Sequence, residues 1–323
     1  MTAIGFPIPQ KRNEQRRALL PPDLENISGS HELVFETGYG DILGYDDDTY
    51  CECGAVVAER SAVCACPVIC VPKPVVTDEY FQPNKTVFGW IHAVQGRKIT
   101  DLIVQNKMTV IAWEDMFENG RHTFWRNNEL SGEAAIVHAF LAWGRAPYGR
   151  KVAVIGRGNV ARGAIRVLER SGCHVTVYDR KTSPILREEV GAFDVVVNAV
   201  LWDLSRTDHI LYEEDLRKLN PGSLIIDISC DEGMGIQSSH ATTVDSPVYW
   251  HRGVLHYAVD HTPTLYFRTA SESISKALLR FIPHLVEEKP NQILEEATIV
   301  RQGEILDQRI IRFQSRQPLP ESN

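Results

Sequence analysis

The sequence has no long hydrophobic run. Its first residues, MTAIGFPIPQKRNEQRR, contain no continuous apolar stretch of the signal-peptide kind, and no later segment approaches the ~20 apolar residues that span a bilayer. Dense blocks of lysine and arginine are also absent, and the formal net charge of −8 over 323 residues repels a phosphate backbone. We therefore expect a cytoplasmic protein with neither a membrane nor a nucleic-acid partner.

Cysteine knuckles of the CxxC kind, which are typical of structural zinc sites, are missing as well. Five of the seven cysteines do fall close together, but the last two of these flank an apolar run that is typical of a strand: Cys51, Cys53, Cys64, Cys66 and Cys70. We expect reduced thiols and no metal, with a structural zinc site as the alternative.

Short apolar runs alternate with helical patterns along most of the chain, without an internal repeat. The alternation predicts an α/β protein with two doubly wound Rossmann-like domains, joined by the helix SGEAAIVHAFLAWGRA. The strands predicted before this helix are AIGF, LVFET, PVICVPK, TVFGWIH and MTVIAWE, and those after it are KVAVIG, CHVTVYD, FDVVVNAV and SLIIDIS.

The pattern changes after residue 260. FRTASESISKALLRFIPHLVEE predicts one amphipathic helix, and ATIVRQGEIL predicts a hairpin around Gln302 and Gly303. We expect this tail to return to the first domain, which makes that domain discontinuous. The predicted domains are a substrate domain of residues 1–130 plus 266–323 and a dinucleotide-binding domain of residues 131–265.

The segment KVAVIGRGNVARGAIRVLER has the properties of a dinucleotide loop. Gly156 permits a tight turn, Gly158 lets the backbone approach a pyrophosphate, and Ala161 allows close packing of the helix that follows. Asp179 ends the next strand at about the expected offset of ~20 residues. The alternative is a glycine turn that binds no cofactor. The predicted cofactor-binding residues are Gly156, Arg157, Gly158, Asn159, Val160, Asp179, Arg180 and Asn198.

The choice between the two nicotinamide cofactors depends on the charges around Asp179. An acid at this strand end favours the free ribose hydroxyls of NADH, whereas Arg157, Arg180 and Lys181 favour the 2′-phosphate of NADPH. We favour NADPH and keep NADH open.

Four polar residues follow predicted strands of the first domain, where open α/β sheets gather ligands. Arg16 either binds a carboxylate or belongs to a solvated loop. Lys73 either binds a carbonyl or carboxylate or is a solvated residue at a strand end. Glu114 is a site acid or an ordinary helix N-cap. His92, in FGWIHAVQ, transfers protons or packs in the core.

These residues lie in segments that resemble a known family. NEQRRALLP resembles NExRVALTP of alanine dehydrogenases, CVPKP resembles their KVKEP, and IDISCDEG resembles their VDVAxDQGG. GWIHAV is similar to the strand that carries their catalytic histidine. The resemblance covers nearly the whole chain and indicates the superfamily of alanine dehydrogenase, transhydrogenase and lysine-forming saccharopine dehydrogenase.

Longer stretches, among them GWIHAVQ, AWEDMFENGRHTFWRNNELSGEAAI and GRGNVARGA, are similar to the opine-type synthases of this superfamily. That resemblance implies an NADPH-dependent condensation of pyruvate with the side-chain amine of ornithine, and less readily of lysine, to an N-(1-carboxyethyl) amino acid.

The resemblance also implies roles for individual residues and an active site in the cleft between the domains. Arg16 resembles the clamp for the pyruvate carboxylate, Lys73 the substrate-binding lysine, His92 the acid–base histidine and Asp231 the aspartate facing the nicotinamide. The chain departs from alanine dehydrogenases at PKP, which lacks their glutamate.

A second departure lies at Asp260-His261, where alanine dehydrogenases carry Asn-Met. Both departures make ammonia a less expected substrate. The product of the implied reaction carries two carboxylates and one α-ammonium, so we assign Arg126 to the amino acid carboxylate and Glu114 to an ammonium, with structural roles as the alternative.

Three functions stay open. An alanine dehydrogenase or a saccharopine-type enzyme is the first alternative to the opine-type synthase, and a non-catalytic NAD(P)-binding module is the second. The joint presence of Lys73, His92 and Asp231 argues against a binding module, which has no use for acid–base groups. Because members of the superfamily are often oligomers, we also expect a homo-oligomer.

Overall fold

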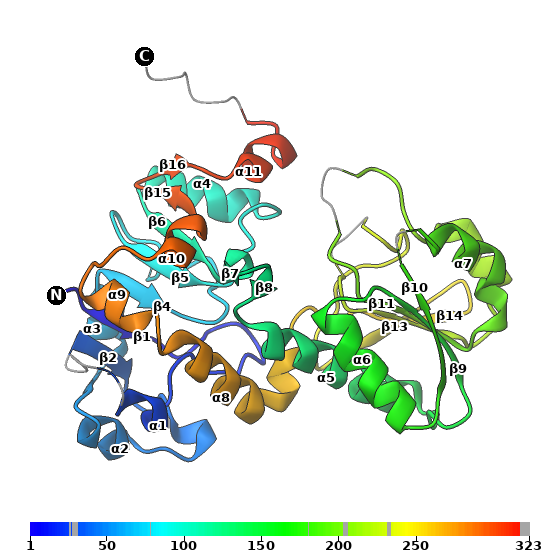
Figure 1. The fold of residues 1–323 in the computed structure, drawn as a ribbon, viewed down its shortest axis with the longest axis horizontal. Helices are drawn as coiled ribbons and strands as arrows, with labels where there is room; N and C mark the ends of the chain where they lie inside the picture. The colour runs from blue at the N-terminus through cyan, green and yellow to red at the C-terminus, as the bar shows by residue number, and fades with distance from the viewer. Residues whose placement is uncertain are drawn as a thin grey trace. The chain divides into compact units, whose positions relative to one another are not determined.

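The computed structural model describes residues 1–25, 27, 32–77, 79–179, 181–202, 206–230 and 234–316. The chain forms two compact units, Met1–Phe124 with Phe267–Asn323, and Trp125–Tyr266. Each unit is built on a mostly parallel sheet flanked by helices, which confirms the α/β prediction (Figure 1). The residues 130 and 131, at which the sequence places the boundary, fall inside a helix of the second unit.

The first unit contains a sheet in the order β16-β15-β6-β5-β4-β1-β2-β3. The six strands from β6 to β3 are parallel, whereas β15 and β16 run antiparallel to their neighbours. The parallel strands are β1 (Ile4–Phe6), β2 (Leu33–Glu36), β3 (Val56–Ala58), β4 (Val68–Cys70), β5 (Thr86–Gly89) and β6 (Thr109–Ala112), followed by β15 (Thr298–Arg301) and β16 (Glu304–Ile305).

Aromatic side chains fill the core on one side of this sheet. Phe6 and Phe35 stack with their ring centres 4.5 Å apart, and Tyr39 and Tyr50 pack edge-on beside them, all fully buried. Burying such large apolar surfaces stabilises the short strands that carry them. The helices of this unit are α1 (Pro21–Leu24), α2 (Asp47–Glu52), α3 (Arg60–Ala65), α4 (Arg97–Gln105), α8 (Phe267–Leu278), α9 (Ile282–Val286), α10 (Gln292–Glu296) and α11 (Gln308–Phe313).

The carboxyl-terminal tail contributes to the first sheet. Its hairpin is confirmed, because β15 and β16 pair across a turn in which Gln302 (φ 48°) and Gly303 (φ 85°) both have positive φ, as a tight two-residue hairpin turn requires. The single helix predicted before it is wrong. It is divided into α8 and α9, because Pro283, in the first turn of α9, has no N–H with which to continue the hydrogen bonding of α8.

The second unit contains a sheet in the order β10-β9-β11-β12-β14-β13, in which only β13 is antiparallel. Its strands are β9 (Lys151–Ile155), β10 (His174–Tyr178), β11 (Val195–Asn198), β12 (Leu224–Asp227), β13 (Val248–His251) and β14 (Val254–Tyr257), and its helices are α5 (Trp125–Trp143), α6 (Asn159–Arg170) and α7 (Ser183–Glu189).

Helices α5 and α6 lie side by side in Figure 1, and their backbones approach closely at Gly163. A Cβ at this position would lie 1.9 Å from the carbonyl oxygen of Glu129 on α5, so no larger residue fits without displacing one of the helices. This contact places the amino end of α6, where the cofactor loop was predicted, against α5.

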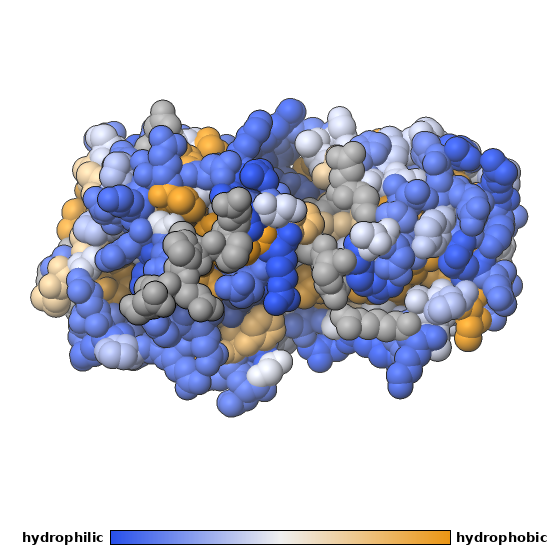
Figure 2. All heavy atoms as spheres, turned by 90° about the horizontal axis from the view of Figure 1, so that it is seen from above, coloured by the Kyte–Doolittle hydropathy of each residue, from blue (hydrophilic) through white to orange (hydrophobic). Residues whose placement is uncertain are grey.

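The surface shown in Figure 2 is mostly hydrophilic, with apolar side chains in small scattered patches. Among the described residues, no helix combines the length and the apolar character needed to cross a membrane.

The cysteines form no disulfide. Cys64, Cys66 and Cys70 are buried, and burial raises the pKa of each thiol above its ordinary value, which keeps all three protonated at neutral pH. Within the ranges that the structure describes, no group of three or more histidine, cysteine or acidic side chains is arranged to hold a metal ion.

Candidate functional site

The four polar residues predicted for the first unit follow neighbouring strands. β1, β4, β5 and β6 are adjacent and parallel, so their carboxyl ends share one edge of the sheet. Lys73 comes after β4, His92 after β5 and Glu114 after β6, while Arg16 lies in the loop that leaves β1. Ligands of open α/β sheets bind at this edge.

Glu114 holds the main chain at His92. Its Oε1 accepts a hydrogen bond of 2.6 Å from the His92 N–H, and its Oε2 accepts one of 3.2 Å from the Ile91 N–H. His92 has left-handed backbone with φ 50°, which is uncommon for a residue other than glycine. Since both oxygens of Glu114 bind the main chain, this arrangement favours a positioning role for it over the predicted contact with a substrate ammonium.

Burial raises the pKa of Glu114 to about 7, although the two main-chain N–H groups oppose the rise because they stabilise the charged form. Asp115, the next residue, adds a like charge and raises the pKa further. The carboxyl group that holds His92 therefore changes its charge near neutral pH.

The side chain of His92 is exposed, whereas Trp90 and Ile91 before it are buried. Packing in a core does not account for an exposed histidine on strained backbone at a strand end. The arrangement favours the interpretation of His92 as a group that transfers protons.

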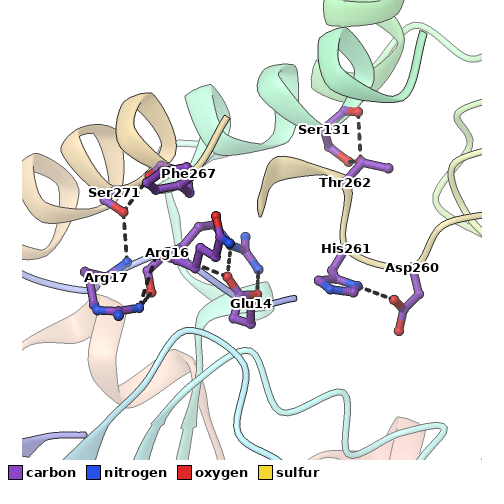
Figure 3. A network of polar contacts seen from close by, with 10 residues as sticks. Glu14, Arg16, Arg17, Ser131, Asp260, His261, Thr262, Phe267 and Ser271 are labelled. Carbon is purple, nitrogen blue, oxygen red and sulfur yellow. Dashed lines mark hydrogen bonds and ion pairs between the residues drawn. The ribbon is translucent and has the colours of Figure 1, made fainter. Parts of the chain in front are cut away.

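Arg16 lies close to the same strand end. Its guanidinium is 5.0 Å from the ring centre of Trp90, two residues before His92, and Trp90 in turn packs edge-on against Trp113. Nε and Nη2 of Arg16 donate to Oε1 and Oε2 of Glu14, and both side chains are almost completely buried (Figure 3). The pair with Glu14 was not predicted, because any acid nearby in sequence would have been an equal candidate.

The loop that carries Arg16 is anchored by the carboxyl-terminal helix α8. The Arg17 N–H donates to Ser271 Oγ at 2.8 Å, as Figure 3 shows, and the Leu20 N–H donates to Ser275 Oγ at 2.9 Å. The two serines are four residues apart and thus share one face of the helix. Their spacing in SESISK is the only sequence signal for this anchor.

Lys73 is half-buried in the loop that follows β4. Pro72 and Pro74 flank it and are themselves buried, so the backbone around the lysine has little freedom. The position agrees with the predicted binding of a carbonyl or carboxylate at this edge of the sheet.

In the second unit, the predicted cofactor loop joins β9 to α6. Gly156 has φ 118°, and a Cβ there would lie 2.8 Å from the Ala199 carbonyl oxygen. A Cβ on Gly158 would meet no atom within 4 Å, which leaves this side of the loop open. α6 begins at Asn159, followed by Val160 and the buried Ala161, and the first N–H groups of a helix have no acceptor within the helix itself. This open cradle at a helix amino end fits the pyrophosphate of a dinucleotide.

Asp179 follows β10 at the same edge. Its Oδ1 accepts the Lys181 and Thr182 N–H groups, and its Oδ2 lies 3.3 Å from Arg157 Nε. The Lys181 N–H is the main cause of a pKa below the usual aspartate range. Arg180, also predicted to bind the cofactor, lies outside the described residues.

Asn198 ends β11 and is buried, with its Nδ2 donating to Asp227 Oδ1 at 2.9 Å. Asp227 ends the neighbouring strand β12 and also accepts the Ser229 N–H at 3.1 Å. The predicted cofactor residue Asn198 thus ties two strand ends together. Asp231, the residue predicted to face the nicotinamide, lies outside the described residues.

Arg126 belongs to an ionic network between α5 and α6. Its Nη1 lies 3.1 Å from Glu129 Oε2 and 2.8 Å from Glu133 Oε1, and Arg166 of α6 contacts the same two glutamates. The hydrogen bonding of the Arg126 guanidinium to the carboxylate of Glu133 is the main cause of a raised pKa of Arg126. These contacts favour a structural role over the predicted binding of a substrate carboxylate.

A second histidine–acid contact lies just after β14. His261 is buried, and its Nδ1 contacts Oδ1 of Asp260, whose side chain remains 32% exposed (Figure 3). The next residue, Thr262, donates from Oγ1 to the Ser131 carbonyl oxygen at 2.9 Å, which fixes the segment against α5.

Two family models match the chain. The model described as "Alanine dehydrogenase/PNT, N-terminal domain" matches residues 5–124, and "Alanine dehydrogenase/PNT, C-terminal domain" matches residues 180–313. The first match ends where the first continuous part of the first unit ends.

Individual relatives agree with these models. The chain is 32% identical over 299 residues to N(5)-(carboxyethyl)ornithine synthase of Clostridium botulinum, covering 86% of this chain and 93% of the relative. It is 26% identical over 340 residues to alanine dehydrogenase of Bacillus subtilis, covering 93% of this chain and 90% of that relative.

The fold is similar to the solved structure of an L-alanine dehydrogenase, with a TM-score of 0.83, 20% identity and coverage of 97% of this chain and 99% of that one. Together with the dinucleotide cradle between β9 and α6, these likenesses show that the chain belongs to the alanine dehydrogenase/PNT family of NAD(P)-dependent dehydrogenases.

Proposed function

We propose that the protein catalyses the NADPH-dependent condensation of pyruvate with the side-chain amine of ornithine, or less readily of lysine, to an N-(1-carboxyethyl) amino acid. The observation that carries the proposal is the exposed His92, held on left-handed backbone by Glu114 at the strand end beside Arg16 and Trp90. A non-catalytic nucleotide-binding module has no need for a proton-transfer group held in this way.

The choice of substrates draws on the 32% identity to the N(5)-(carboxyethyl)ornithine synthase of Clostridium botulinum. It also draws on the polar pair Asp260 and His261, which stands where alanine dehydrogenases carry Asn-Met. The second candidate is an alanine dehydrogenase, favoured by the similar fold and the 26% identity to the enzyme of Bacillus subtilis.

Pyruvate binds through Arg16 and Lys73 in this proposal. Glu14 engages one edge of the Arg16 guanidinium and Trp90 lies against its face, so the orientation of this cation is fixed before a carboxylate binds. Lys73, as a cation on restricted backbone, stabilises negative charge on the C2 oxygen when the amine attacks.

His92 carries the proton transfers. The imidazole first takes a proton from the side-chain ammonium, and the neutral amine then attacks C2 of pyruvate. The amine nitrogen passes a proton to the C2 oxygen, which becomes a hydroxyl. The imidazolium then returns its proton to this hydroxyl, which leaves as water and yields the iminium. One group serves both steps because the unperturbed pKa of histidine is about 6.5.

The dinucleotide would be held by Gly156, Gly158 and the amino end of α6, with Asp179 and Arg157 near the adenosine ribose. When bound, the nicotinamide supplies the hydride that reduces the imine carbon. Arg157 and Lys181 are the described cations in a position to favour a 2′-phosphate, which is why we propose NADPH.

A matched panel of assays tests the proposal. Oxidation of NADPH and of NADH is followed with pyruvate or 2-oxoglutarate as the oxo acid and ornithine, lysine or ammonia as the amine. We expect the highest kcat/KM with NADPH, pyruvate and ornithine, and a product whose mass equals that of ornithine plus pyruvate minus one oxygen atom. Activity only with ammonia would establish the alanine dehydrogenase instead.

A variant of the proton-transfer group completes the test. His92→Gln should bind NADPH as the parent does, measured by fluorescence titration, while kcat falls by a factor of roughly 100 or more. An unfolded variant, or one with unchanged turnover, would contradict the role of His92.

A further inference from the structure

The carboxyl-terminal segment of the first unit reaches the turn that follows His92. Gln314 comes directly after α11 and is only 5% exposed. Its Nε2 donates to the carbonyl oxygens of Ala93 at 2.8 Å and of Val94 at 3.1 Å. These contacts join residues that are 221 and 220 positions apart along the chain. A glutamine near the end of the sequence therefore binds the main chain beside the proposed proton-transfer group.

The turn from His92 to Gly96 is also closed by its own main chain. The Gly96 N–H donates to the His92 carbonyl oxygen at 3.1 Å. Thr100, in the first turn of α4, donates from Oγ1 to the Ala93 carbonyl oxygen at 2.8 Å, and Gln314 Nε2 lies 3.1 Å from the same hydroxyl. Ala93 and Thr100 are fully buried. The turn is thus tied to α4 as well as to the segment after α11.

Gln314 is itself held in place. Arg97 Nη1 donates to its main-chain oxygen at 2.7 Å, and Arg316 Nε donates to its Oε1 at 2.6 Å. Arg316 also pairs with Asp101 of α4 at 2.6 Å, and α11 lies beside α4 in Figure 1. Both ends of the amide of Gln314 therefore have partners, and a buried amide bound in this way is costly to displace.

His92 consequently lies between two anchors. Glu114 accepts its N–H, and Gln314 binds the carbonyl oxygens of the two residues that follow it. The side chain of His92 is exposed and its backbone has φ 50°, so the core does not fix the direction of the imidazole. The main chain on either side sets that direction, because the backbone determines where the Cα–Cβ bond points.

We propose that Gln314 is a positioning residue for His92, because its amide holds the turn after β5 in the form that directs the imidazole toward the substrate. The inference rests on the role of His92 in the proposed function, and it adds the carboxyl-terminal segment to the parts of the chain that this role requires. Gln314 acts through the main chain of Ala93 and Val94. Misplacing a reacting group by about 1 Å can lower a rate as much as ~100-fold, so the effect belongs in kcat.

Gln314→Met tests the inference. Methionine has about the length and volume of glutamine, but it lacks the N–H groups that bind Ala93 and Val94. The variant is assayed with NADPH, pyruvate and the amine that the parent uses best. We expect kcat to fall about 10-fold. The KM for pyruvate should change less than about twofold, because Arg16 and Lys73 lie in loops after other strands.

Two isotope effects separate a positioning role from a loss of stability. Slower proton transfer by His92 should raise the solvent deuterium isotope effect on kcat in Gln314→Met. It should also lower the effect of deuterium at the transferred position of NADPH, because hydride transfer then limits the rate less. A variant that has only lost folded protein keeps both isotope effects of the parent and binds fewer equivalents of NADPH in a fluorescence titration.

Gln308→Met is the matched control. It makes the same substitution at the exposed glutamine that begins α11, and it should keep the kcat and both isotope effects of the parent. Arg97→Ala is a second test variant, which removes the hydrogen bond to the main-chain oxygen of Gln314 from the surface. It should change the isotope effects in the same direction with a smaller loss of kcat, and it decides the question if Gln314→Met does not fold.

The outcomes separate the inference from the proposed function. An unchanged kcat in Gln314→Met, or a lower kcat with the isotope effects of the parent, would show that Gln314 only stabilises the fold, while the role of His92 stands. If the parent itself does not turn over pyruvate and ornithine, the proposed function fails. The test of Gln314 can then still be made with ammonia, if the parent uses it.

Discussion

The carboxylate of Glu114 holds the main chain of His92, with 2.6 Å between Oε1 and the His92 nitrogen. Left-handed backbone at a non-glycine residue costs on the order of 1 kcal/mol or more, and the hydrogen bonds from Ile91 and His92 offset that cost. The contact connects the ends of β5 and β6, so the direction of the His92 side chain depends on an acid that is distant in sequence.

Replacement of Glu114 by glutamine should therefore impair turnover more than binding. A glutamine offers one acceptor oxygen for two N–H groups, and its NH2 group opposes the second. We expect kcat to fall about 10- to 100-fold in steady-state assays, with little change in the KM for ornithine. An unchanged kcat with a raised KM for ornithine would instead support the binding of a substrate ammonium by Glu114.

The pKa of Glu114 also predicts a pH dependence of stability. Burial raises this pKa from 4.5 to about 7, so the folded protein binds more protons than the unfolded chain between these values. The protonated carboxyl of Glu114 therefore stabilises the folded state relative to the charged form. This stabilisation is complete below pH 4.5 and is lost as the pH rises through 7. Between pH 5 and pH 8, Glu114 should lower the free energy of unfolding by about 2 kcal/mol.

Urea unfolding of the parent and of Glu114→Gln at both pH values measures this contribution. The free energy of unfolding should change less between pH 5 and pH 8 in the variant than in the parent, by about 2 kcal/mol. Equal pH dependence in the two proteins would show that Glu114 is charged throughout this range.

The position of Arg157 predicts a preference for NADPH over NADH. It lies 3.3 Å from Asp179 and is 65% exposed, which leaves it accessible to a 2′-phosphate. Arg157→Ala should raise the KM for NADPH about tenfold and leave the KM for NADH nearly unchanged. Arg170→Ala, an exposed arginine at the carboxyl end of α6, serves as the control. Equal effects on both nucleotides would contradict the preference for NADPH.

Arg126→Ala distinguishes the structural from the substrate-binding role of this arginine. Because Arg166 still contacts Glu129 and Glu133, we expect a loss of only about 1 kcal/mol in the free energy of unfolding and unchanged KM values for ornithine and pyruvate. A rise in the KM for ornithine alone would show that Arg126 binds the amino acid carboxylate after all.

Local pattern was sufficient for much of the fold. Most of the apolar runs became buried parallel strands, and the glycines of GRGNVARGA lie where a strand meets a helix. The hairpin at Gln302 and Gly303 also formed, with both residues at positive φ, which Gly303 adopts without steric cost. Such features depend on neighbours in sequence and are therefore visible in it. Pro283 was a sequence signal for the break between α8 and α9. The amphipathic pattern, which runs on through this proline, instead favoured one continuous helix.

The sequence by itself determined which residue types stand at the strand ends: a histidine after β5, a lysine after β4, an arginine after β1 and a glycine loop after β9. Only the tertiary structure decided what these groups contact. It bound Glu114 to the main chain of His92, Arg16 to Glu14 and Trp90, Arg126 to two glutamates, and Asp260 to a buried histidine. Glu114 and His92 are distant along the chain, as are Arg16 and Trp90. Whether such a group meets a substrate or another side chain depends on which strands and helices become neighbours, because ion pairs and hydrogen bonds act only over a few ångströms.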